Sequence, residues 1–127
     1  MSNPFFVVAA IDDDDTILAA LGALLPMFDC TVELYGSAAA FAAALTTTRA
    51  SCLMIDIHLG TESGLALGRA LVQGGFRFPI IYMTGCPDAA TCWQARDAGG
   101  VAFLRKPFMP EELSRALDAA RRHKPAG

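Results

Sequence analysis

Acidic side chains follow two short apolar runs of the sequence and are its clearest chemical signal. Cys52 opens an apolar run that ends on Asp56, and Asp12 and Asp13 follow the apolar residues 5–11. A short continuous apolar run is typical of a strand buried on both faces of a parallel sheet. The carboxyl ends of such strands meet at the edge where open α/β sheets bind ligands. If the two strands are neighbours, we expect their carboxylates to share one crevice.

Such a cluster needs a counter-charge. At ~4 Å and an effective dielectric constant of about 20, each pair of like charges costs ~4 kcal/mol. Oxygen ligands favour Mg²⁺, so the cluster predicts a magnesium site. Thr84 and Lys106 follow two later apolar runs and add a hydroxyl and an ammonium group to the same edge. These are the groups with which an aspartate receives a phosphoryl group, because metal and ammonium stabilise the transferred charge.

Length and composition narrow the class of protein. The chain has 127 residues, which is enough for one domain with a proper core. Apolar residues make up 54% and charged residues 18%, which suits a sheet covered by helices on both faces. A net charge of −3 without a basic stripe argues against nucleic acid as a direct partner. No charged leader precedes the first apolar run, no stretch is long enough to cross a membrane, and the four cysteines lack metal-binding spacing.

Apolar periodicity predicts five strands that alternate with five helices. We expect the strands at residues 5–11, 31–35, 52–56, 79–83 and 101–104. The helices are expected to begin near Asp15, Ser37, Ser63, Asp88 and Pro110. Residues 58–63 have no periodicity and predict a loop. Units of this length, joined by right-handed crossovers, predict a doubly wound α/β fold with a five-stranded parallel sheet.

The same residues resemble those of a known family, the receiver domain of bacterial response regulators, which are two-component phosphorylation switches. The matching stretches are Ile11-Asp12-Asp13-Asp14, Ile55-Asp56 with Ser63-Gly64-Leu65, Pro79-Ile80-Ile81-Tyr82-Met83-Thr84-Gly85, and Phe103-Leu104-Arg105-Lys106-Pro107-Phe108. The match extends over about residues 5–122. It implies a flavodoxin-like sheet with the strand order 2-1-3-4-5.

The resemblance assigns the acidic residues. Asp56 resembles the phosphoacceptor, and Asp13 and Asp56 resemble side-chain ligands of Mg²⁺. Asp12 resembles a second acid that acts on the metal largely through water. The backbone carbonyl of His58 resembles a third protein ligand.

Three further residues resemble the parts of the family's switch. Lys106 resembles the lysine that pairs with the phosphoryl oxygens, and Thr84 the hydroxyl that moves to bond the phosphoryl group. Phe103 resembles the aromatic residue that turns inward when the threonine moves. It lacks the hydroxyl of the tyrosine found in many relatives, so we expect its switch to work by packing alone.

The loop after Asp56 departs from the family pattern. Gly60 stands where proline is usual and Thr61 where glycine is common, which predicts a looser loop. His58 lies two residues after Asp56, and Cys86 lies two residues after Thr84. Both positions could gate the water that attacks a phosphoryl group.

These expectations describe one receiver domain over residues 1–127, cytoplasmic, with no activity beyond self-catalysed phosphotransfer and autodephosphorylation. A histidine kinase or a histidine phosphotransfer protein is the expected phosphoryl donor. We expect no output domain after Gly127. The surface of the fourth helix, fifth strand and fifth helix is therefore expected to bind a downstream protein or a second copy of the chain.

Two alternatives stay open. Asp12-x-Asp14-x-Thr16 resembles the first motif of haloacid-dehalogenase-type phosphatases, with Asp12 as the nucleophile and Asp14 as the general acid. That reading leaves Asp56 unexplained and puts Asp15 where glycine is usual. The other alternative is a receiver-shaped interaction module that never takes phosphate, against which the full set of site residues argues.

Overall fold

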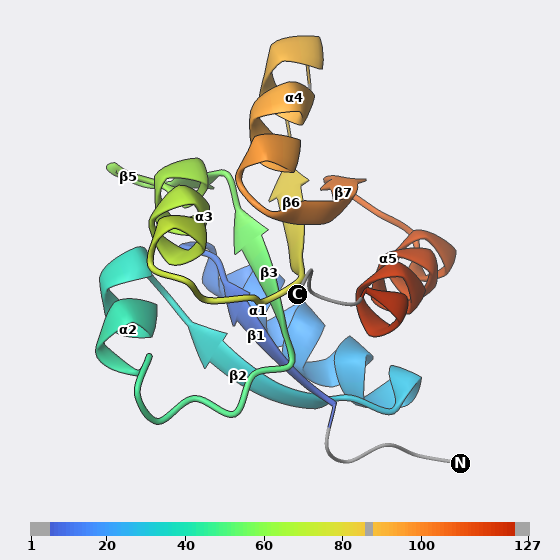
Figure 1. Cartoon of the computed structure of the whole chain (residues 1–127). Helices are drawn as coiled ribbons and strands as arrows, with labels where there is room; N and C mark the ends of the chain where they lie inside the picture. Colours follow the sequence, from blue (N-terminus) through green and yellow to red (C-terminus); the bar gives the residue numbers. More distant parts are fainter. Residues whose placement is uncertain (1–5, 86–87, 124–127) are drawn as a thin grey trace.

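The computed structural model describes residues 6–85 and 88–123, and within these residues a five-stranded parallel sheet forms the centre (Figure 1). Its strands are β1 (Val7–Ile11), β2 (Thr31–Tyr35), β3 (Cys52–Asp56), β6 (Ile80–Thr84) and β7 (Gly100–Arg105). They lie in the order β2-β1-β3-β6-β7, and every neighbouring pair is parallel. In order of appearance along the chain this is 2-1-3-4-5, so the expected fold is confirmed.

Helices cover both faces of this sheet (Figure 1). In the described residues they are α1 (Asp15–Leu24), α2 (Ala38–Ala43), α3 (Gly64–Gln73), α4 (Ala89–Asp97) and α5 (Pro110–Arg122), with a short 3₁₀ helix, η1 (Leu25–Phe28), after α1. One buried cluster joins α1 and α5 to the sheet, and a second joins α2, α3 and α4 to it. None of the helices described here has both the length and the apolar character required to cross a bilayer.

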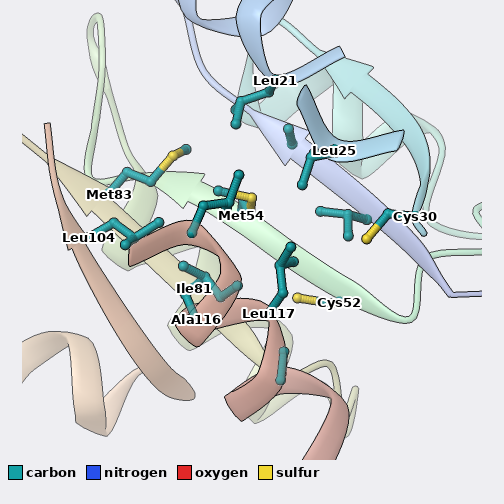
Figure 2. Packing of buried hydrophobic residues seen from close by; sticks show 14 of the residues in the cluster. Leu21, Leu25, Cys30, Cys52, Met54, Ile81, Met83, Leu104, Ala116 and Leu117 are labelled. Carbon is teal, nitrogen blue, oxygen red and sulfur yellow. The ribbon is translucent and has the colours of Figure 1, made fainter. Parts of the chain in front are cut away.

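The central strands are buried at every position because both faces of the sheet are covered. Alternate residues of β3 point to opposite faces. Met54 belongs to the same cluster as Leu21 of α1 and Leu117 of α5 (Figure 2). Leu53 and Ile55 belong to the cluster on the other face. This burial explains why the strands are continuous apolar runs whose polar residues come only at the ends.

The helices begin where their capping residues indicate. The side chains of Asp14, Ser37, Ser63 and Asp88 each accept a backbone N–H bond at the start of a helix. Pro110 opens α5 at the position where its missing N–H costs nothing. These starts place the carboxyl ends of the strands beside the helix N-termini.

Residues 58–63, which the sequence predicted as a loop, form a small antiparallel hairpin. β4 (His58–Leu59) pairs with β5 (Glu62–Ser63). Gly60 has a φ of 64°, in the left-handed region that favours glycine, and it turns the chain together with Thr61. The prediction of an irregular loop was wrong because strands of this length are too short to show an alternating pattern.

The cysteines that the structure describes are free thiols. They are Cys30, Cys52 and Cys92, of which the first two are buried. Burial raises the pKa of Cys52 to about 12, so this thiol stays protonated at neutral pH. Cys86, expected as a possible water gate, lies outside the described residues.

Candidate functional site

Two neighbouring strands bring the acidic residues together. β1 pairs with β3, with Ile11 opposite Ile55, so Asp12 and Asp56 follow at the same edge of the sheet. Asp12 is fully buried and Asp56 is 6% exposed, whereas Asp13 is exposed. One carboxylate oxygen from each of the three lies within 4.8 Å of the others. The predicted crevice is therefore present in the described residues, and it is an oxygen-rich group of the kind that holds a hard cation.

Local backbone bonds fix the orientation of both buried carboxylates. The backbone N–H of Asp14 donates to Asp12 Oδ1 at 2.9 Å. The backbone N–H of His58 donates to Asp56 Oδ1 at 3.1 Å. Each carboxylate therefore keeps its second oxygen, Oδ2, for partners from other parts of the chain.

Lys106 bonds the Oδ2 atoms of both Asp12 and Asp56. Its Nζ lies 2.6 Å from Asp12 Oδ2 and 3.0 Å from Asp56 Oδ2. The side chain is 17% exposed, so this double ion pair is largely shielded from water. The backbone N–H of Lys106 donates to the carbonyl of Thr84 at 2.8 Å, which extends the β6–β7 pairing to the site.

Burial and pairing oppose each other in the pKa values of these groups. Burial raises the pKa of Asp12, and the hydrogen bonds from Lys106 and from the Asp14 backbone only partly offset it. Burial on its own lowers the pKa of Lys106, but the bonds to Asp12 and Asp56 outweigh it and raise the pKa overall. The lysine is therefore firmly protonated, and it is the positive charge that stabilises the acidic cluster.

Thr84 and Phe103 lie on adjacent strands beside this cluster. Thr84 ends β6 and is fully buried. Phe103 pairs with Tyr82 in the β6–β7 register and is only half-buried. A hollow of about 200 Å³ under α4 and another of about 250 Å³ beside α5 both have Phe103 in their walls. Phe103 packs against the cluster that joins α2, α3 and α4 to the sheet, so the hollow under α4 is the one on its side-chain face.

The hairpin places His58 beside Asp56 through its backbone. The His58 side chain is exposed, and its backbone N–H holds the phosphoacceptor candidate. Gly64 follows the hairpin at a point of very close approach, because a Cβ atom there would stand 2.0 Å from the backbone oxygen of Asp56. This position therefore requires glycine.

Two interactions near the site have no signal in the sequence. Glu62 bonds the first residues of α2, more than twenty residues earlier in the chain. The hydroxyl of Tyr82 donates to the carbonyl of Ala98 at the end of α4, at 2.5 Å. Both link elements that are distant in the sequence, so neither periodicity nor a capping motif indicates them.

Comparison with known proteins places this fold and site in one family. The model of the response regulator receiver domain family matches residues 8–118. The response regulator protein TodT of Pseudomonas putida is 36% identical over 120 residues, which cover 94% of this chain and 53% of the relative. The transcriptional regulatory protein FixJ of Rhizobium meliloti is 30% identical over 118 residues, covering 93% and 58%. A solved structure of FixJ-N superposes with a TM-score of 0.86 at 30% identity, covering 99% of both chains.

The sheet order and the acidic edge define the class of protein as a receiver domain of two-component response regulators. The chain belongs to the response regulator receiver domain family. It spans about half the length of the curated relatives that it matches. Receiver domains act as phosphoacceptor switches and bind Mg²⁺ in an acidic pocket. The family match argues against the alternative of a haloacid-dehalogenase-type phosphatase. Asp12, the nucleophile in that alternative, is fully buried and both of its carboxylate oxygens are hydrogen-bonded.

Proposed function

We propose that Asp56 accepts a phosphoryl group from a histidine kinase or a histidine phosphotransfer protein in the cytoplasm. The observation that carries this proposal is the position of Lys106, whose ammonium group bridges Asp12 and Asp56. Of these two buried carboxylates, Asp56 is the one with exposed surface. The nucleophile is therefore reachable, while the charge around it is already partly neutralised.

The donor set fits Mg²⁺. Asp12, Asp13 and Asp56 offer carboxylate oxygens within 4.8 Å of one another, and we assign the backbone carbonyl of His58 as a further ligand. When bound, Mg²⁺ would supply positive charge to the phosphoryl oxygens and so ease transfer. Asp12 is assigned to act largely through water.

The other steps of phosphoryl transfer are assigned to Asp56, His58 and Lys106. One oxygen of Asp56 attacks phosphorus, the phosphorus–nitrogen bond of the donor histidine breaks, and its electron pair stays with the imidazole. The His58 backbone N–H and Lys106 hold the carboxylate in place before attack. Lys106 then pairs with the oxygens of the transferred group. Hydrolysis of the resulting acyl phosphate by water is the proposed autodephosphorylation, and no further enzymatic activity is assigned.

The signal is assigned to the surface of α4, β7 and α5. Thr84 moves toward the phosphoryl group, and Phe103 fills the space that opens beside it. The hollow under α4, whose wall includes Phe103, supports this step, because a ring that changes its packing needs room to move into. The altered surface would bind a downstream protein or a second copy of the chain.

Phosphorylation is tested by incubating the chain with acetyl phosphate and Mg²⁺ and trapping the acyl phosphate with borohydride. Peptide mapping should place the adduct on Asp56, and the adduct should disappear in Asp56→Asn. An adduct on Asp12 with Asp56 unmodified would contradict the proposal and favour the phosphatase. Failure to label any residue would favour the interaction module that takes no phosphate.

The switch is tested by amide exchange with and without a beryllofluoride mimic of the phosphoryl group. We expect changed protection in α4 and β7 as well as around Asp56. Changes confined to residues 56–64 would leave the Thr84–Phe103 coupling without support.

A further inference from the structure

Glu62 connects the β4–β5 hairpin, which follows Asp56, to the start of helix α2. Its Oε1 accepts from the backbone N–H of Ala38 at 2.9 Å, and its Oε2 accepts from that of Ala39 at 3.3 Å. Ala38 opens α2, which follows the edge strand β2. The carboxylate therefore joins two segments that are 23 and 24 residues apart.

Helix α2 is held in place by its own core packing and its own cap. Phe41 of α2 is fully buried and meets the rings of Tyr35 and Phe78 edge-on, at centroid distances of 5.3 and 6.2 Å. Ser37 caps the same helix independently, because its Oγ accepts from the backbone N–H of Ala40 at 3.0 Å. The helix start thus has a cap of its own, and Glu62 anchors the hairpin to an element already held by the core.

The β4–β5 hairpin connects Glu62 to Asp56, the phosphoacceptor candidate. Glu62 pairs with Leu59, and the adjacent pair in the same ladder joins Ser63 to His58. His58 in turn donates its backbone N–H to Asp56 Oδ1. A continuous series of bonds therefore runs from α2 through Glu62 and the hairpin to the Asp56 carboxylate.

We propose that Glu62 is a positioning residue that sets the lifetime of the phosphoryl group on Asp56. By holding the hairpin against α2, it keeps the His58 backbone in place and restricts the approach of water to the acyl phosphate. It takes over the restraint that a proline at Gly60 would otherwise supply. The inference rests on the proposed phosphorylation of Asp56.

Glu62→Ala removes both bonds and should speed the loss of the phosphoryl group by about five- to tenfold, the factor that corresponds to ~1–1.4 kcal/mol. Glu62→Gln keeps a carbonyl oxygen that can accept one of the two N–H groups. It should therefore restore part of the lifetime. Amide exchange of residues 57–64 should rise in the same order, with wild type slowest, Glu62→Gln intermediate and Glu62→Ala fastest.

Ser37→Ala is the matched control. It removes a capping bond from the same helix without touching the hairpin, so it should lower stability but leave the dephosphorylation rate unchanged. Near-UV circular dichroism establishes that each variant is folded. Where Glu62→Ala is not folded, the comparison of wild type with Glu62→Gln takes its place and should still show the faster loss.

The outcomes separate this inference from the proposed function. Wild type labelled on Asp56, with equal dephosphorylation rates in wild type and the folded Glu62 variants, would overturn the role of Glu62 alone. The same acceleration in Ser37→Ala would also overturn it, because the effect would then come from α2 stability. Wild type that takes no label on Asp56 would overturn the proposed function and this inference with it.

Discussion

Replacing Lys106 by methionine tests how the acidic cluster is stabilised when no metal is bound. The change keeps most of the side-chain volume but removes the ammonium group that bridges Asp12 and Asp56. Asp12 is fully buried and Asp56 nearly so, which leaves two shielded carboxylates without a counter-charge. We expect a marked loss of stability in EDTA at neutral pH.

The cost of breaking the buried ion pair sets the size of this loss. Breaking a buried ion pair by removing one partner costs ~3–5 kcal/mol, and the 17% exposure of Lys106 puts this pair near the lower end. The clustered carboxylate oxygens lie within 4.8 Å of one another. At about that spacing and an effective dielectric constant of about 20, two carboxylates repel each other by ~3 kcal/mol. This repulsion is present in both proteins, but only in wild type does Lys106 offset it. A loss of ~3 kcal/mol is a large part of the ~5–15 kcal/mol that stabilises a typical domain.

Magnesium binding and low pH should each reduce the difference in stability between wild type and Lys106→Met. Without the competing ammonium group we expect the variant to bind Mg²⁺ about tenfold more tightly, which returns ~1.4 kcal/mol of the lost stability at saturation. Burial already raises the pKa of Asp12, and losing the Lys106 bond raises it further. A carboxyl whose pKa is higher in the folded than in the unfolded chain gains stability as the pH falls through its folded pKa. The variant should therefore recover toward wild type below neutral pH.

Urea unfolding followed by far-UV circular dichroism, in EDTA and in saturating Mg²⁺, measures these effects. Arg105→Met is the matched control, because it removes the same charge from an exposed neighbouring side chain. It should change stability by no more than about 0.5 kcal/mol. A loss below ~1 kcal/mol for Lys106→Met in EDTA, or a gap that Mg²⁺ leaves unchanged, would refute this account of the cluster.

Three further predictions follow from other contacts. Asp13→Asn removes the charge of one carboxylate that we propose as a ligand, so it should weaken Mg²⁺ binding by about tenfold in calorimetric titration. Equal affinity would refute the ligand assignment. Gly68→Ala would place a Cβ atom 1.7 Å from the Tyr82 hydroxyl, so it should cost ~3 kcal/mol in urea unfolding. Combining it with Tyr82→Phe should cost less than the sum of the two changes, and simple additivity would contradict the proposed clash. Burial raises the pKa of Glu33, but hydrogen bonds from Thr48, Tyr35 and the Arg49 backbone outweigh it and lower the pKa overall. Above the unfolded pKa of Glu33, wild type should therefore be more stable than Glu33→Gln, by at most ~1 kcal/mol after solvent screening. This advantage should disappear as the pH falls through the folded pKa. A difference in stability that does not vary with pH would contradict the prediction.

Local patterns were enough to predict the five helices, the strands of the central sheet and the acidic edge, but not the β4–β5 hairpin. The strands β1, β3 and β6 are buried on both faces, so their sequences are continuous apolar runs, and the carboxylates that follow had to lie at the carboxyl edge. Capping residues such as Ser63 and Asp88 marked the helix starts because a cap acts within the first turn of its own helix. The strand order itself came from the family resemblance, since no local pattern specifies which strands are neighbours.

Only the tertiary structure decided the interactions between distant segments. Lys106 reaches Asp12 across 94 residues, and Glu62 reaches Ala38 across 24. The Tyr82 hydroxyl finds the Ala98 carbonyl across 16 residues, in a space that Gly68 leaves open. Such contacts depend on strand order, register and the packing of helices against the sheet, which arise only when the whole chain is folded. Periodicity and capping carry information over a few residues, and the partners that orient this site are much farther away.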